Sequence, residues 1–263
     1  MSATASIRPM GGAVRQPTTD HRPGMGRLVA VELRKMVNTR SGFWLPISVA
    51  AITLLAAIIS SSNHGGRDGT FVHVLHASTL PSAYLLPVIG VLLLCAEWSQ
   101  RTTLTTFTLV PSRPRVILAK LGASAIVSTI ALGVCLLLTL VCASAFGHAP
   151  GGTGSLTWQL VVQSWVFLVA GMVMGLAFGA AILLSAPAIV IYLLLPVVWE
   201  AIVNNITALD GVARWLSASN TLSPLTQQAL NGTQWAHALV TFAFWIGIPI
   251  VVGLARIGRG DID

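Results

Sequence analysis

The fold is decided by residues 121–199, which read LGASAIVSTIALGVCLLLTLVCASAFGHAPGGTGSLTWQLVVQSWVFLVAGMVMGLAFGAAILLSAPAIVIYLLLPVVW and contain no Asp, Glu, Lys or Arg. A soluble domain of this length needs a hydrated face, and this stretch supplies no charge for one. As a continuous helix it would extend ~118 Å at 1.5 Å per residue, several times the ~30 Å of a hydrocarbon core. The segment is therefore predicted to cross a membrane more than once.

The rest of the chain has the same character. Of its 263 residues, 54% are hydrophobic and 9% are charged, against roughly 25% charged in ordinary globular proteins. The net charge of +7 is carried by bases that flank the apolar runs without interleaved aromatic residues. We therefore expect a lipid bilayer, and no nucleic acid, as the partner of these bases. Cys95, Cys135 and Cys142 lie inside apolar runs and form no disulfide or C-x-x-C pattern.

Polar segments divide the chain into six predicted spans, which makes the fold class all-α and polytopic. The spans are predicted at about 43–61, 75–96, 117–146, 158–184, 187–203 and 235–254. Ser185-Ala186-Pro187 is the only strong turn signal between the fourth and fifth spans, so a very short turn is expected there. Residues 1–26 lack an apolar core and are predicted to be a disordered tail, with Met25 as an alternative start. Residues 27–259 form the six-span domain, and residues 260–263 form a short C-terminal tail.

The basic residues predict the orientation. With the N-terminus inside, 13 bases fall before the first span, between the second and third, and after the sixth. Only Arg67 and Arg214 fall in the outer loops. Because cytoplasmic segments carry the excess of Lys and Arg, both termini are predicted to be cytoplasmic.

Residues 27–40 are predicted to form an amphipathic helix in the membrane interface before the first span. One face carries apolar residues at helical spacing, namely Val29, Leu33, Met36 and Val37. The other face carries Glu32, Arg34, Lys35 and Asn38. A simple basic anchor that fixes topology is the alternative interpretation.

The polar segment after the second span, residues 97–107, is the other candidate for a functional surface. Glu97 and Arg101 are spaced i, i+4 and can pair on a helix. Thr102, Thr103 and Phe107 follow, and Pro111 ends the segment. A short charged helix under the bilayer would suit docking of a soluble partner, and a solvated loop is the alternative.

Small and polar residues within the spans suggest how the helices pack. Gly171, Gly175 and Gly179 recur every four residues and form one smooth stripe, which lets another helix approach closely. Ser124, Ser128 and Thr129 either line a substrate pathway or form ordinary interhelical hydrogen bonds. Glu97 and Glu200 are the only acids near the spans, and both lie at predicted span ends, which disfavours an ion-coupled carrier.

No catalytic motif is present. The lysines, Lys35 and Lys120, do not belong to a P-loop, and both H-E-x-x-H and G-x-S-x-G are absent. We therefore predict no enzyme activity, no catalytic residue and no cofactor in this chain. His73 and His76 are spaced i, i+3 and could share a metal with His64 or Asp68, but unrelated interfacial histidines are the simpler interpretation.

Two stretches resemble the permease subunits of ABC transporters of the ABC-2 type. The first is ELRKMVNTRSGFW at residues 32–44, before the first span. The second is PSRPRVILAK at residues 111–120, which leads into the third span after a Glu and a Thr-rich stretch. The terse turn between the fourth and fifth spans and the polar segment before the last span also resemble that family. Its members often place a base in that turn, and this chain has none.

The resemblance implies a transport function with separate subunits. Two six-span permeases, either identical or different, would form the pathway of an exporter, and two cytoplasmic ATPases would bind ATP and Mg²⁺ beneath them. The residues that would couple to the ATPase are Glu32, Arg34, Lys35, Glu97, Arg101, Thr102, Thr103 and Phe107. The outer segment, residues 210–230, would form a partly re-entrant helix with Val212, Trp215 and Leu216 as its apolar face.

The same resemblance implies a location in the plasma or inner membrane of a bacterium. Two other functions stay open at this point. One is a membrane assembly or sensor protein that transports nothing, and the other is an ion-coupled secondary transporter.

Overall fold

Apolar helices of membrane length make up most of the structure. The computed structural model describes residues 24–38, 40–63, 71–99, 113–146 and 156–258. A short first helix, α1 (Met25–Val37), precedes the long helices α2 (Arg40–Asn63), α3 (Phe71–Ser99), α5 (Arg113–Ala145), α6 (Trp158–Ile182), α7 (Ser185–Asn205) and α10 (Gly232–Gly258). Between α7 and α10 lie the short elements η1 (Thr207–Leu209), α8 (Asp210–Leu216), α9 (Ala218–Leu222) and η2 (Ser223–Thr226). These described ranges contain no strand.

Six of the helices are long and apolar enough to cross a bilayer. Their membrane-length segments are Gly42–Ser62, Phe71–Cys95, Arg115–Ala145, Trp158–Ile182, Ser185–Asn205 and Gly232–Arg256. Each segment coincides with one span expected from the sequence. A helix satisfies its own backbone hydrogen bonds, which is why such segments are stable in hydrocarbon. The predicted class, an all-α polytopic membrane protein, is confirmed.

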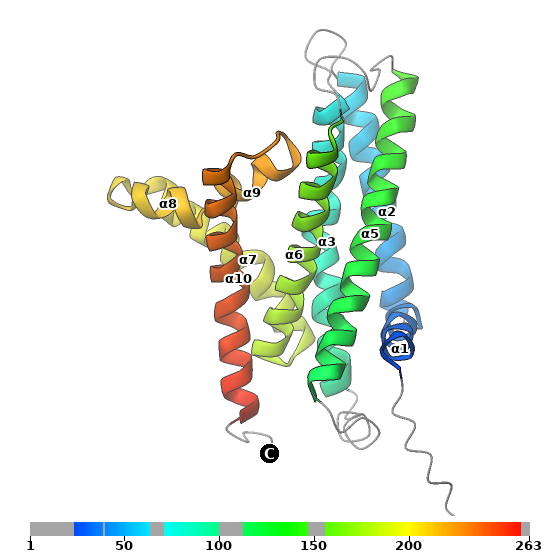
Figure 1. Ribbon diagram of the computed structural model, residues 1–263, viewed down its shortest axis with the longest axis vertical. Coiled ribbons are helices and arrows are strands. Elements are labelled where there is room, and N and C mark those ends of the chain that lie inside the picture. The colour runs from blue at the N-terminus through cyan, green and yellow to red at the C-terminus, as the bar shows by residue number, and fades with distance from the viewer. Residues whose placement is uncertain (1–23, 39, 64–70, 100–112, 147–155, 259–263) are drawn as a thin grey trace, which may run out of the picture.

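The bundle is built around α3 and α6. Of the span windows, 61% of α3 and 44% of α6 are buried inside the protein, against 17% for α2 and for α7. Figure 1 shows α2, α3 and α5 on one side of α6, and α7 and α10 on the other. The short helix α1 lies across the spans at one end of the bundle, where α10 also ends. We call this the α1 end, and we call the opposite end, which carries α8 and α9, the α8 end.

Glycines allow the two central helices to approach closely. A Cβ atom on Gly175 of α6 would overlap the backbone carbonyl of Pro87 of α3. A Cβ on Gly90 of α3 would lie 2.6 Å from the carbonyl oxygen of Met172. Gly171 and Gly179 also face α3, and the glycine stripe of α6 therefore packs against this helix.

The turn between α6 and α7 lies two residues earlier than the sequence suggested. Leu183 adopts a left-handed conformation with φ 63°, and its N–H donates to the Gly179 carbonyl at 2.8 Å. This closes α6 as a left-handed C-cap, although Gly is the usual residue there. The Ser185-Ala186-Pro187 motif instead begins α7, because proline in a first turn loses no helical hydrogen bond.

Alanine substitution along the glycine stripe tests the α3–α6 contact. Gly175→Ala should destabilise the protein by roughly 1–3 kcal/mol, because the new methyl group must displace backbone. Gly171→Ala is the matched control, since its Cβ would lie 3.4 Å from the Cγ of Pro87, an ordinary contact. Thermal unfolding in detergent measures both variants. Equal melting temperatures for the two would contradict this packing.

Candidate functional site

A buried ion pair joins α1 to the bundle. The Lys120 Nζ atom of α5 lies 2.8 Å from Glu32 Oε2 of α1, and each residue is 4% exposed. Lys120 also donates a hydrogen bond to the Leu93 carbonyl of α3 at 3.3 Å. The Lys35 Nζ atom lies 2.8 Å from Glu32 Oε1, so each carboxylate oxygen faces an ammonium group. One carboxylate thus connects α1 with α5, and the lysine that it binds reaches α3.

Burial makes these contacts mutually dependent. A charged group removed from water loses several kcal/mol of hydration, and only a close partner with good geometry restores it. Lys120 recovers this free energy from Glu32 and from the Leu93 carbonyl. Lys35 is less constrained, because 39% of its side chain is exposed. The pair between Glu32 and Lys120 is therefore the part of the cluster that cannot be opened without a large cost.

Apolar contacts hold α1 in the same place. A Cβ on Gly122 of α5 would lie 3.1 Å from Val29 Cγ2, so the absence of a side chain at Gly122 lets α1 approach α5 closely. Met36 is buried in one cluster with Leu93, and Val29 and Leu33 pack against that cluster. The helix α1 is therefore part of the hydrophobic core at this end of the bundle.

The sequence assigned the faces of α1 only in part. Val29, Leu33 and Met36 face the bundle as expected. Val37 does not, since it is 59% exposed. Glu32 was expected on the polar face, but it points into the bundle because Lys120 lies there to receive it.

Only some of the other proposed coupling residues lie in the described part of the structure. Arg34 is exposed on α1, and Lys35 binds Glu32. Glu97 lies in the last turn of α3, but its side chain is outside the described part of the structure. The remaining residues of that set lie outside the described residues altogether, namely Arg101, Thr102, Thr103 and Phe107. Their coupling role stays a prediction.

At the opposite end, α8 is held by its backbone carbonyl groups. Thr241 Oγ1 of α10 donates to the Trp215 carbonyl at 2.7 Å. The indole N–H groups of Trp199 and Trp245 donate to the Leu216 carbonyl at 3.2 and 3.4 Å. The last carbonyl groups of a helix have no partner within that helix, and here α7 and α10 provide the donors.

The three residues expected to form the apolar face of the outer segment are only partly covered by the rest of the described structure. Val212 and Trp215 are exposed, Leu216 is half-buried, and Ala213 is the buried residue of α8. Trp215 packs edge-on against the His237 ring with a centroid distance of 4.1 Å. The segment is also interrupted, because Ser217 caps α9 by accepting from the Asn220 N–H and so starts a new helix.

Glu200 ties α7 to the start of α9. Its carboxylate accepts hydrogen bonds from Ser217 Oγ at 2.9 Å, Ser219 Oγ at 2.8 Å and the Ser219 N–H at 3.1 Å. Asn204 Nδ2 donates a further bond at 2.8 Å. A negative charge at a helix N-terminus also interacts favourably with the helix dipole. Glu200 therefore anchors the outer segment to the spans.

The histidines at the α8 end bind hydroxyl and amide groups. His73 Nδ1 lies 3.2 Å from Ser60 Oγ. His76 lies 2.6 Å from Thr226 Oγ1 and 3.2 Å from Gln227 Nε2. Within the described ranges, no three metal-binding side chains come together. His64 and Asp68, the other residues of the suggested metal set, lie outside those ranges.

Lys120 is the residue at this site that sequence reasoning missed. The sequence assigns it no role in the site beyond that of a base that helps to orient the chain. Its apolar neighbours could have indicated that it is buried in a span. Four apolar residues, Val116–Ala119, precede it and an apolar run follows it. A lysine inside a span needs an acidic partner, but its position does not say which acid supplies it.

Fold and site together define an all-α polytopic membrane protein whose amphipathic first helix is locked to its spans by a buried ion pair. No protein-family model and no curated protein matches the chain.

Removal of one partner of the pair should be strongly destabilising. Lys120→Met leaves Glu32 buried beside Lys35 alone, and we expect a loss of about 3–5 kcal/mol. Lys35→Met is the control and should cost less, since its side chain is partly exposed. The double variant Glu32→Leu/Lys120→Met removes both charges and should recover part of the loss. The melting temperatures of the variants in detergent measure these losses. A Lys120→Met variant as stable as Lys35→Met would show that the Glu32–Lys120 pair does not stabilise the fold.

Proposed function

We propose that this protein is the membrane-spanning permease subunit of an ATP-driven exporter of the ABC-2 type. The observation that carries the proposal is the attachment of α1 to α5 and α3 through Glu32, Lys120 and the Leu93 carbonyl. In such an exporter, a helix at the membrane interface must pass motion from a separate ATPase to the spans. A helix locked into the core is suited to this task, whereas a loosely attached anchor is not.

The proposed coupling runs through the buried pair. The ATPase binds ATP with Mg²⁺ and contacts the exposed side of α1 at the cytoplasmic face of the membrane. Arg27 and Arg34 lie seven residues apart and are both exposed, so they present positive charge on that side to an acidic partner surface. A displacement of α1 then moves Lys120, and with it α5, relative to the rest of the bundle.

Buried hydroxyl groups support a second packing arrangement of the spans. The Oγ atoms of Ser124 and Ser128 in α5, and of Ser164 in α6, are buried and have no hydrogen-bond partner among the residues that the structure describes. An unsatisfied buried hydroxyl group costs about 1–3 kcal/mol. A state in which α5 moves away from its present neighbours would hydrate these groups and recover that free energy. Thr129 differs, because it already bonds the Trp165 indole N–H and the Ala125 carbonyl.

The outer segment supplies the opposite end of the proposed pathway. Glu200, Thr241 and the two indole N–H groups fix α8 and α9 to α7 and α10. A second permease copy would complete the pathway, because six spans give only half of the arrangement expected for such exporters. We place the complex in the plasma or inner membrane, with the α1 end in the cytoplasm.

Charge reversal on α1 tests the proposal. The chain is purified from its native membrane in mild detergent, and the amount of co-purified ATPase and the rate of ATP hydrolysis are measured. Arg34→Glu should lower both several-fold, because it places a negative charge on the docking side of α1. Arg214→Glu on α8 is the matched control at the other end of the bundle and should change neither.

Three results separate the alternatives. A wild-type chain that retains no ATPase after gentle solubilisation favours an assembly or sensor protein. Transport that collapses with the proton gradient while ATP persists favours an ion-coupled carrier. Equal ATPase binding by Arg34→Glu and Arg214→Glu removes α1 from the coupling surface.

A further inference from the structure

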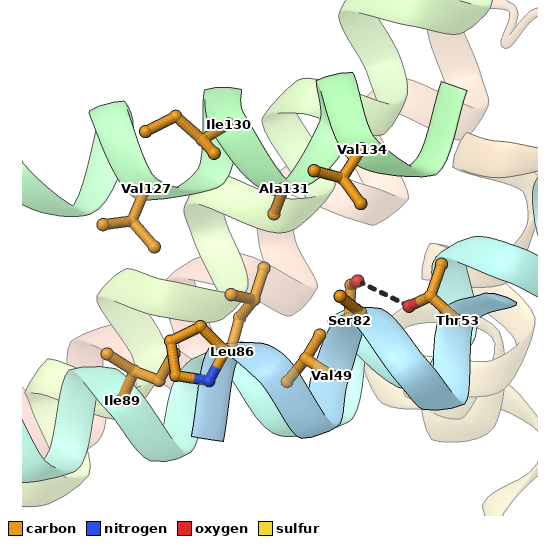
Figure 2. Close-up of a pocket in the computed structure, with 11 residues that line it drawn as sticks. Val49, Thr53, Ser82, Leu86, Ile89, Val127, Ile130, Ala131 and Val134 are labelled. Carbon is orange, nitrogen blue, oxygen red and sulfur yellow. Dashed lines mark hydrogen bonds between the residues drawn. The ribbon is translucent and has the colours of Figure 1, made fainter. Parts of the chain in front are cut away.

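An apolar groove lies between α2, α3 and α5 in the membrane-spanning part of the bundle. Its lining residues are Pro46, Val49, Ala50 and Thr53 of α2, Ser82, Leu86 and Ile89 of α3, and Val127, Ile130, Ala131 and Val134 of α5. Each helix contributes about two turns, so the groove is ~10 Å long at 1.5 Å per residue. In Figure 2, Val127, Ala131 and Val134 point toward Val49 and Leu86 across the gap.

The lining of the groove is almost wholly apolar. Its two polar side chains, Thr53 and Ser82, lie 3.4 Å apart and bond each other, as the dashed line in Figure 2 marks. Ser82 Oγ also lies 3.4 Å from Cys135 Sγ. These hydroxyl groups therefore need no hydrogen bond from a ligand. A cavity lined by apolar atoms excludes water. Only an apolar occupant gains free energy there.

The groove opens onto the lipid-facing surface. Its floor is buried, with Leu86 and Ile89 each less than 5% exposed, whereas Ile130 at its rim is 62% exposed. Aliphatic side chains continue from this rim along α2 and α5, among them Ile47, Ile52, Ile126 and Leu137, all exposed. The groove is therefore continuous with the surface that contacts hydrocarbon, and the medium outside it is lipid tails.

Size determines which occupant fits. The cavity volume is about 100 Å³, below the ~300–1,000 Å³ of pockets that hold drug-sized ligands. A helix from a second copy is ~10–12 Å across with its side chains and cannot enter. A single flexible hydrocarbon chain is slender enough, and it is the commonest apolar group in the surrounding bilayer.

We propose that this groove is a binding site for one acyl chain of a membrane phospholipid. The bound chain would fill the space between α2 and α5 and support their packing. The proposal does not rest on the exporter function, because it depends only on the shape of the groove and on its exposure to lipid.

Site-directed filling of the groove provides the test. Ala50→Leu adds three carbons inside the groove, whereas Ala51→Leu adds the same three carbons at an exposed neighbouring position of α2. Both variants and the wild type are placed in phosphatidylcholine nanodiscs that contain a phospholipid with a diazirine in the middle of one acyl chain. After photolysis, the labelled peptides are mapped by mass spectrometry.

The wild type should be labelled within residues 127–134, and Ala50→Leu should lower this labelling several-fold while Ala51→Leu leaves it unchanged. Ala131→Leu, with Gly133→Leu at an open position as its control, repeats the test from α5 in case Ala50→Leu fails to fold. Equal labelling of each filled variant and its control would overturn the proposal. Efficient disulfide formation between two copies through Ile130→Cys, with the groove unlabelled, would also overturn it.

Discussion

The ion pair between Glu32 and Lys120 is the contact on which the arrangement of the α1 end depends. An unpaired charge is costly both in hydrocarbon and in a protein core. The buried Lys120 therefore requires an acid within a few ångströms. The acid comes from α1, a helix that precedes the first span, and it draws that helix into the core. The interface helix, the third span and the carbonyl of Leu93 in the second span consequently share one network.

Most of the fold was predictable from the sequence, because long uncharged segments have few alternatives to transmembrane helices. The six spans follow from this constraint, and the amphipathic first helix follows from the helical spacing of its apolar residues. The position of the α6–α7 turn could not be predicted, because Leu183 adopts a left-handed conformation that leucine rarely adopts. The broken outer segment was also missed, since the contacts that hold α8 are made by the backbone carbonyl groups of Trp215 and Leu216, which any residue carries.

The candidate site was harder to predict than the fold. Glu32 was recognised as part of a functional helix, but the helical periodicity of α1 placed it on the polar face. Its partner Lys120 lies 88 positions further along the chain, and nothing in the local pattern of either residue specifies such a pairing. The groove between α2, α3 and α5 could not be predicted from the sequence either. Ala50 and Ala131 differ from other small residues in these spans only in the residues that face them in the folded structure.

Two-sided cysteine labelling tests most directly the claim that the α1 end and the α8 end lie on opposite sides of one membrane. In a variant that lacks Cys95, Cys135 and Cys142, single cysteines replace Arg34 of α1 or Asn231 before α10, both exposed. With a membrane-impermeant maleimide on intact cells, the account predicts labelling at position 231 at once and at position 34 only after permeabilisation. Labelling of both positions from the same side would contradict the six-span layout and the exporter proposal with it.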